Sequence, residues 1–64
     1  MIDAYIDGAE NALRSGKSLA RGAFKLGIAN QMLGSVFFEW TPEEFQARLD
    51  RIGILLEEYE ALLG

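Results

Sequence analysis

The fold of this chain is decided by residues 40–63, which read WTPEEFQARLDRIGILLEEYEALL. Thr41 and Glu44 have the spacing of a capping box, in which each side chain accepts a hydrogen bond from the backbone N–H of the other residue. The proline between them stands at the first helical position, where its missing N–H costs nothing. Trp40 and Phe45 occupy the two positions of a hydrophobic staple around the cap. These signals predict a helix that begins directly after the threonine and runs to the end of the stretch.

Apolar residues recur along this helix at steps of four and three, which is the spacing of a seam that packs against another helix. Two further leucines widen the seam into the broader stripe of a helix that faces a core. The helix therefore needs an apolar surface on which to pack. The seam residues are Phe45, Leu49, Ile52, Leu56, Tyr59 and Leu63.

The preceding residues predict one or two more helices. Residues 18–38 keep the same apolar rhythm and add a stripe of small residues, which lets another helix approach closely. Residues 2–14 have apolar and acidic faces at helical spacing. Gly16 can cap the first of these helices, and Ser18 can start the second. The apolar pattern also continues without a phase shift, so a single helix over residues 2–37 is the alternative. We favour the break because glycine is a poor residue inside a helix.

We therefore expect an all-α single domain over residues 1–64, an antiparallel helical hairpin or three-helix unit with helices at about 2–14, 18–38 and 42–63. A chain this short buries only about 60% of the surface that its unfolded form exposes. It has no Cys and no His, so disulfides and the usual zinc ligands are missing. We expect a homodimer to complete the core. The residues expected at the helix–helix or oligomer interface are Ala20, Ala23, Gly27, Leu49, Ile52, Leu56, Tyr59 and Leu63.

The charges are divided along the chain, and the formal net charge is −4. The middle of the chain carries four basic residues and no carboxylate, whereas the two ends carry all 10 acidic residues. In an antiparallel hairpin of the last two helices, Arg21 is predicted to face Glu57 and Glu58. Lys17 is predicted to face Glu60. Exposed pairs of this kind are worth about 0–1 kcal/mol each, so they would set the orientation of the helices more than their stability.

The four basic residues also suggest an alternative, a nucleic-acid-associated regulator. Spaced three and four apart, they form one helix edge over residues 14–25 that could contact phosphates. The acidic surface could instead imitate DNA. Nucleic-acid-binding domains usually have a basic excess, and this chain has a pI near 4.5, so we do not expect nucleic acid as the partner. The possible nucleic-acid contacts are Arg14, Lys17, Arg21 and Lys25.

The sequence shows no catalytic or cofactor chemistry. The run Gly16-Lys17-Ser18 matches the end of a phosphate-binding loop, but Asn11 stands where the first glycine of that loop belongs, and we interpret the match as chance. Without Cys or His, the common nucleophile–base pairs and zinc sites cannot be built. We expect no enzyme activity, no cofactor and no metal.

The sequence also lacks a recognisable targeting or membrane-spanning segment. The first ten residues are acidic, unlike the start of a signal peptide. The most apolar stretch, residues 22–38, is interrupted by Lys25, Asn30 and Gln31 and falls short of the roughly 20 apolar residues that span a bilayer. We expect a cytoplasmic protein without a membrane partner, and a peptide that rests on a membrane surface is a third alternative.

The interpretation that accounts for most of these features is a small non-catalytic protein-interaction module. It would act as an accessory regulator or inhibitor, of the kind that phages encode, by binding a larger protein. The expected partner surface is the aromatic group before the last helix, since aromatic residues are favoured binding anchors. It consists of Phe37, Phe38 and Trp40, of which Phe38 is expected to be the most exposed.

Overall fold

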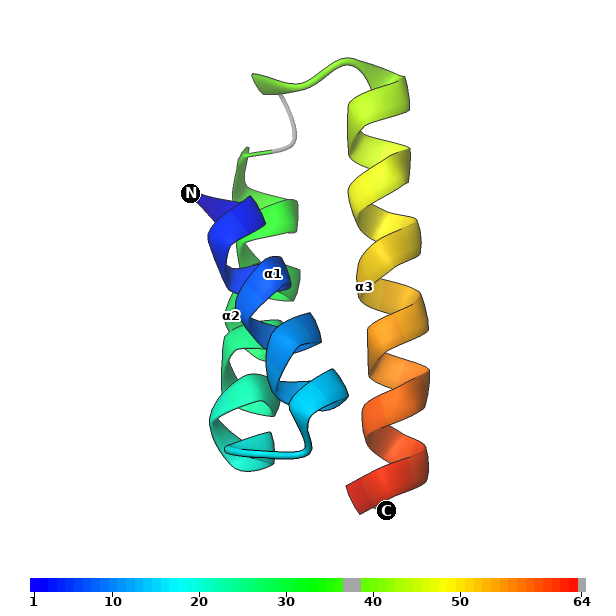
Figure 1. Cartoon of the computed structure of the whole chain (residues 1–64). Coiled ribbons are helices and arrows are strands. Elements are labelled where there is room, and N and C mark those ends of the chain that lie inside the picture. Colours follow the sequence, from blue (N-terminus) through cyan, green and yellow to red (C-terminus); the bar gives the residue numbers. More distant parts are fainter. Residues whose placement is uncertain (37–38, 64) are drawn as a thin grey trace.

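In the computed structural model, which describes residues 1–36 and 39–63, the chain forms three α-helices, and the described residues include no strand (Figure 1). The helices are α1 (Ile2–Ser15), α2 (Leu19–Val36) and α3 (Pro42–Leu63). The predicted all-α three-helix unit is confirmed. The helix boundaries lie within one residue of the expected positions, except that the expected end of the second helix at residue 38 lies outside the described residues. The homodimer stays a prediction.

The break between α1 and α2 lies at Gly16, as predicted. Gly16 has a φ of 73°, and its N–H donates to the Ala12 carbonyl at 3.0 Å. This is the left-handed helix cap that glycine adopts without a steric penalty. After it, the Ser18 carbonyl accepts the Gly22 N–H at 2.9 Å and starts α2. The alternative of one helix over residues 2–37 is therefore wrong.

The start of α3 follows the capping signals of the sequence. The Thr41 N–H donates to Glu44 Oε1 at 2.9 Å, and the Glu44 N–H donates to Thr41 Oγ1 at 3.1 Å, which completes the capping box. Trp40 and Phe45 flank the box, and both pack against the core as partly buried side chains. The Arg48 guanidinium lies 4.7 Å from the centre of the Trp40 ring, within the range of a cation–π contact. The first turn of α3 is thus fixed by local contacts.

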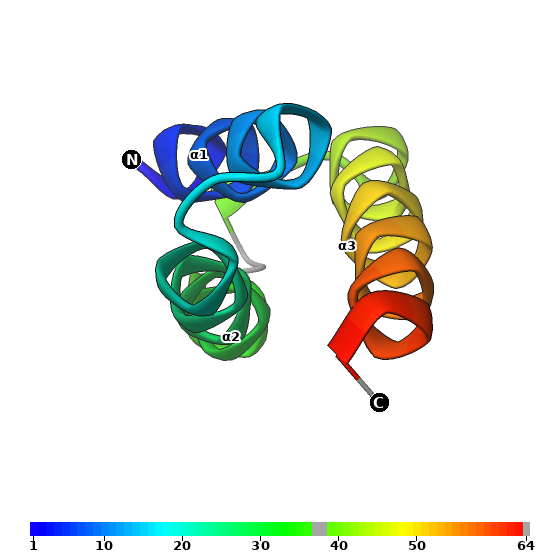
Figure 2. The same cartoon turned by 60° about the horizontal axis from the view of Figure 1, so that its bottom comes forward.

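The helices alternate in direction, so α1 and α3 run parallel to each other and antiparallel to α2 (Figure 1). α1 and α2 form the most extensive helix pair, and α3 packs more on α2 than on α1. In the view tilted so that the bottom comes forward, the three helices stand at the corners of a triangle (Figure 2). The molecule measures 33 × 18 × 16 Å, and α3 spans its full length at about 1.5 Å per residue. None of the described helices is long and apolar enough to cross a membrane.

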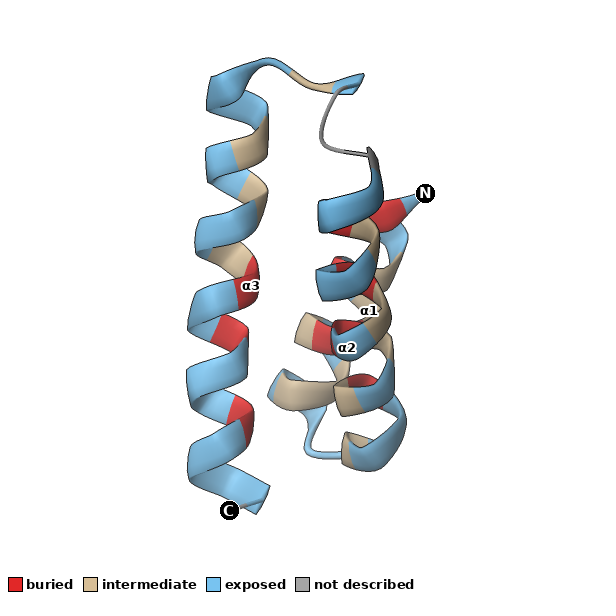
Figure 3. Ribbon diagram, turned by 180° about the vertical axis from the view of Figure 1, so that it is seen from behind, coloured by how far each residue is buried: buried red, intermediate tan, exposed pale blue. Residues whose placement is uncertain are grey.

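The core lies where the three helices meet, and each helix contributes three buried apolar side chains (Figure 3). Burying a large aliphatic side chain stabilises a fold by about 1.5–3 kcal/mol. On α3 the buried positions keep a spacing of three and four but include Leu55 instead of its neighbour Leu56. One edge of the predicted seam is therefore left exposed. The buried core residues are Ile2, Ile6, Ala9, Leu26, Ala29, Leu33, Ile52, Leu55 and Tyr59.

Tyr59 joins all three helices. The end of its ring lies against Gly22 on α2, where an added Cβ would overlap the tyrosine hydroxyl and the Ala12 methyl group. The hydroxyl donates a buried hydrogen bond of 2.6 Å to the Ala9 carbonyl on α1. The closest approach of small residues inside the chain is therefore at Gly22, which was not part of the predicted small-residue interface.

The ion pairs between helices join α1 to α3. Arg48 Nη2 lies 3.0 Å from Asp3 Oδ2. Arg51 Nη2 lies 3.0 Å from Asp7 Oδ1 and 2.8 Å from Glu10 Oε1. The acidic face of α1 is therefore turned toward the two arginines of α3.

The predicted ion pairs between α2 and α3 do not form among the described residues, so that prediction is wrong. It placed Arg21 beside Glu57 and Glu58, and Lys17 beside Glu60. Lys17 and Arg21 instead line a groove between α1 and α2, to which no described residue of α3 contributes.

Candidate binding surfaces

Three leucines of α3 remain exposed along one flank of the helix. Leu49, Leu56 and Leu63 are 40%, 38% and 55% exposed. They are spaced seven residues apart, close to two helical turns, so they form one line. Arg51 stands on the other side of the buried positions and reaches α1 through its ion pairs. The line of leucines therefore lies on the side of α3 that adjoins α2.

The adjoining flank of α2 carries small or uncharged residues. Lys25 marks the opposite flank, because its side chain lies over Gly8 of α1. Gly27 and Gly34 have nothing within 4 Å of the place where a Cβ would stand. We call this flank of α2, together with the three leucines of α3, the α2/α3 face. The charged residue within this face is Glu60 of α3. The α2 residues of the face are Ala20, Ala23, Gly27, Asn30 and Gly34.

The structure divides the predicted interface residues between the core and this face. Ile52 and Tyr59 are buried inside the chain, and Ala23 is half-buried. The remaining residues would be accessible to a second molecule, whereas the two buried ones would not. The exposed predicted interface residues are Ala20, Gly27, Leu49, Leu56 and Leu63.

The predicted aromatic surface falls mostly outside the described part of the chain, which includes neither Phe37 nor Phe38. Trp40 is described and is half-buried. Its ring packs against the core and lies near the Arg48 guanidinium. Trp40 thus helps to hold the start of α3 in place, as its position in the staple predicts.

Three of the four predicted basic contacts line an open groove of about 360 Å³ between α1 and α2. They are Lys17, Arg21 and Lys25, and no acidic residue is among the described residues that line the groove. The fourth residue, Arg14, instead pairs with Glu10 at 2.9 Å. We call this site the basic groove.

Paired and unpaired cations occupy different parts of the molecule. The three cations of the basic groove form no ion pair with any described residue, whereas the other three basic residues are paired. Hydrogen bonds from Arg14 and then Arg51 lower the pKa of the Glu10 carboxyl, although its burial acts in the opposite direction. The hydrogen bond to Asp7 raises the pKa of Arg51, again against the effect of burial. The carboxylates of α1 are thus engaged on the flank that faces α3.

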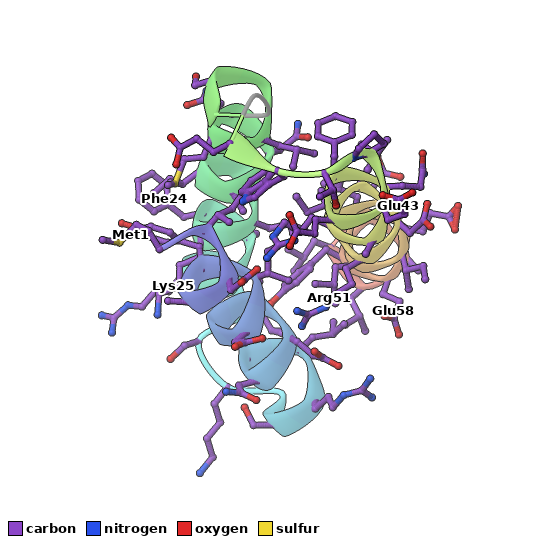
Figure 4. All side chains as sticks on the ribbon, turned by 90° about the horizontal axis from the view of Figure 1, so that it is seen from above. Met1, Phe24, Lys25, Glu43, Arg51 and Glu58 are labelled. Carbon is purple, nitrogen blue, oxygen red and sulfur yellow. The ribbon has the colours of Figure 1, made fainter. Side chains whose placement is uncertain are left out.

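Phe24 is the one exposed aromatic side chain among the described residues, with 69% of its surface accessible. It was not among the predicted contacts. It stands three residues after Arg21 and four before Ile28, on the outward side of α2, and it points away from α3 (Figure 4). The signal that could have found it is its position outside the apolar seam of its helix, where Leu26 and Leu33 are buried.

No cluster of acidic residues able to hold a metal ion occurs within residues 1–36 and 39–63. No family model, curated protein or solved structure matches the chain. A proposal of function therefore rests on the α2/α3 face, the basic groove and the exposed aromatic side chain beside it.

Proposed function

We propose that this chain is a non-catalytic protein-interaction module that dimerises through the α2/α3 face and acts by binding a larger protein. The observation that supports the proposal most directly is the line of exposed leucines at positions 49, 56 and 63. Their spacing of seven residues is the spacing with which one helix packs along another. The small side chains on the α2 flank would allow the partner helix to come close to the backbone.

The energetics favour a second copy as the occupant of this face. Covering a leucine that is about half exposed contributes roughly 1 kcal/mol, so the three leucines together contribute about 3 kcal/mol. Association costs about 4–15 kcal/mol in lost freedom of motion. In a two-fold dimer the partner contributes the same three leucines again, which raises the sum to about 6 kcal/mol. The leucines of two copies therefore offset only the lower part of that cost, and a dimer at micromolar concentration also requires the close packing that the small residues of α2 would allow.

The dimer would act as an accessory regulator or inhibitor of a larger protein. The paired charges make the two nucleic-acid alternatives less favourable. Arg14 is engaged by Glu10, which leaves three cations on the basic edge instead of four. The carboxylates of α1 are engaged by arginines of α3, which reduces the acidic surface that could imitate DNA.

The test is the molar mass of the purified chain over a range of concentrations, measured by light scattering and sedimentation equilibrium. The wild type should be a dimer at micromolar concentration. The double variant Leu49→Glu with Leu56→Glu should be a folded monomer, because it places four carboxylates at the two-fold contact. Ile54→Glu is the matched control, since Ile54 is 59% exposed on the flank of α3 that faces away from α2. A wild-type monomer at every concentration, or equal loss of the dimer in the control, would contradict the proposal.

A further inference from the structure

One side of the molecule combines unpaired cations with an exposed aromatic ring. In Figure 4, Phe24 and Lys25 point away from α3, on the same side as Met1. Glu43 and Glu58 point to the opposite side. These two sides of the molecule thus differ in charge, and the basic side also carries apolar side chains (Figure 4).

The apolar and basic residues form two neighbouring rows. Arg21 and Lys25 are about one turn apart on α2. Lys17 precedes the helix, in the connection from α1, and lines the same groove. Phe24 and Ile28 are also about one turn apart on α2. Phe24 is exposed, whereas Ile28 is half-buried. A basic row beside an apolar row is the pattern of helices that lie in the interface of a membrane.

We infer that this side of α2 docks the protein on the surface of a bilayer that contains anionic lipids. Lys17, Arg21 and Lys25 hold lipid phosphates at the basic groove. Phe24 enters the boundary between the headgroups and the acyl chains. The helix lies along the surface of the bilayer and does not span it.

Lys17 and Arg21 are exposed and can reach such phosphates, and Lys25 is half-buried in the groove. Gly8 has no side chain, so Lys25 lies across it, with Nζ only 3.1 Å from the place where a Cβ would stand. Ser15 and Ser18 add hydroxyl groups to the lining. The carboxylates of α1 are held by the arginines of α3 and do not neutralise the groove.

The apolar row favours a bilayer over a nucleic acid. A phosphate backbone would engage the three cations equally well, but it would give no reason for Phe24 to be exposed beside them. The net charge of −4 opposes the approach to any anionic surface at long range. Asp3 and Glu39 line a depression next to Met1, so the N-terminal end is the less favourable contact, and α2 is the docking element.

The full chain should be tested by sedimentation with vesicles of phosphatidylcholine alone and of phosphatidylcholine mixed with phosphatidylglycerol. We expect binding to the mixed vesicles, weakening as the salt concentration rises, and no binding to the neutral vesicles. Replacing Lys17, Arg21 and Lys25 by glutamine should weaken binding about a hundredfold. Circular dichroism of each variant shows whether the helices are retained.

Two matched pairs of variants separate a docking surface from a general effect of charge or hydrophobicity. Arg21→Gln should weaken binding about fivefold, whereas Arg14→Gln should have little effect, because Arg14 is already paired with Glu10. Phe24→Ala should weaken binding roughly tenfold. Leu62→Ala, at a leucine of α3 that is 59% exposed, should leave binding unchanged.

The following results would overturn the inference. Equal sedimentation with both kinds of vesicle, or with neither, excludes docking by anionic lipid. Unchanged binding by Phe24→Ala excludes insertion of the ring. Displacement from the vesicles by inorganic phosphate at constant ionic strength would assign the groove to a free anion. Tighter binding to duplex DNA than to the mixed vesicles would assign it to nucleic acid.

Discussion

α2 packs against its two neighbours in different ways. Toward α1 the contact is close, since a Cβ on Gly22 would overlap Ala12 and a Cβ on Gly8 would press on Lys25. Toward α3 the contact is open along one edge, where Gly27 faces free space and the leucines of α3 stay partly exposed. The α1–α2 contact is thus fully packed within the chain, whereas the α2–α3 contact is open along one edge.

The difference between the two contacts shows that two helices pack closely when both of them carry small residues at the contact. α1 and α2 each place small residues at their contact, so the two backbones approach and the space between them is filled. On the side of α3, Gly27 and Gly34 of α2 face free space, and the leucines of α3 stand partly exposed at the edge of the contact. Tyr59 is the exception, because its ring end fills the space against Gly22 and bonds to Ala9 on the far helix. α3 therefore depends on a few large side chains.

The largest expected effect tests that dependence by comparing a buried residue of α3 with an exposed one. Tyr59→Ala removes the side chain that contacts both other helices and should lower the free energy of unfolding by about 3–5 kcal/mol. Leu56→Ala, at a position that is 38% exposed, should lower it by less than about 1 kcal/mol. Urea unfolding at a concentration where the chain is monomeric checks both values. Similar losses in the two variants would show that the open edge is as important to the fold as the core.

A second comparison uses two glycines of α2 that differ in their surroundings. Gly22→Ala should destabilise the fold by about 1–3 kcal/mol, because the new methyl group meets the Tyr59 hydroxyl and Ala12. Gly27→Ala should stabilise it by about 0.5–1 kcal/mol, because the methyl group enters free space in a helix. Thermal unfolding of the two variants should therefore shift in opposite directions at a concentration where the chain is monomeric, so that the proposed dimer contact at Gly27 has no effect. Shifts in the same direction would contradict the contrast between the two contacts of α2.

The start of α3 should contribute less than its core contacts. Thr41→Ala removes the hydroxyl that accepts the Glu44 N–H and should cost about 1 kcal/mol. Thr41→Ser retains a hydroxyl and should cost only a few tenths of a kcal/mol. The midpoint of urea unfolding distinguishes the two substitutions. A loss in the alanine variant as large as that of Tyr59→Ala would mean that α3 is held chiefly by its cap.

The smallest expected effect is the pH dependence of the ion pairs between α1 and α3. The pKa of Glu10 lies below its ordinary value of 4.5, because hydrogen bonds from Arg14 and then Arg51 favour the carboxylate. The unfolded chain therefore takes up the proton first as the pH falls. The stabilisation is complete above pH 4.5 and is lost as the pH falls through the lowered pKa of the folded state.

Glu10→Gln should therefore be less stable than the wild type at neutral pH, and the two unfolding midpoints should converge in acid. Glu57→Gln is the control, because Glu57 is an exposed glutamate of α3 that takes no part in the ion pairs of the described residues. A constant difference between the wild type and Glu10→Gln across the acid range would exclude this contribution.

The helix boundaries could be predicted from the sequence because they depend on neighbours in the chain. The capping box joins Thr41 to Glu44, and the left-handed cap joins Gly16 to Ala12, so each signal lies within four residues. The rotation of α3 could not be predicted in the same way. Leu55 and Leu56 each continue a three-and-four rhythm, and only the position of the other helices decides which one is buried.

The candidate binding surfaces, like the helices, could be predicted only where they depend on residues close together in the chain. The sequence predicted one basic helix edge, but the helix breaks at Gly16, so that only Arg21 and Lys25 lie on α2. Arg14 lies on α1 and pairs with Glu10, four residues before it, as that spacing favours. The pairs that turn α1 toward α3 join residues 41 to 45 positions apart. Such contacts depend on the rotation of two helices at once, which the pattern of either helix leaves open. The exposure of Phe24 likewise depends on the rotation of α2 relative to its neighbours.

The hydrogen bond from Tyr59 to Ala9 also has a consequence for the order of folding. It joins residues 50 positions apart, whereas the α1–α2 turn is closed by neighbours in the chain. Contacts between near neighbours require little loop closure and form early, and distant contacts come later. The α1/α2 hairpin should therefore assemble first and α3 should dock last. Until α3 docks, Tyr59 is not in place against Gly22, and the core-facing and the outward-facing apolar residues of α3 are all in water. The helix that completes the core is therefore the part of the folding chain that is exposed to other molecules for the longest time.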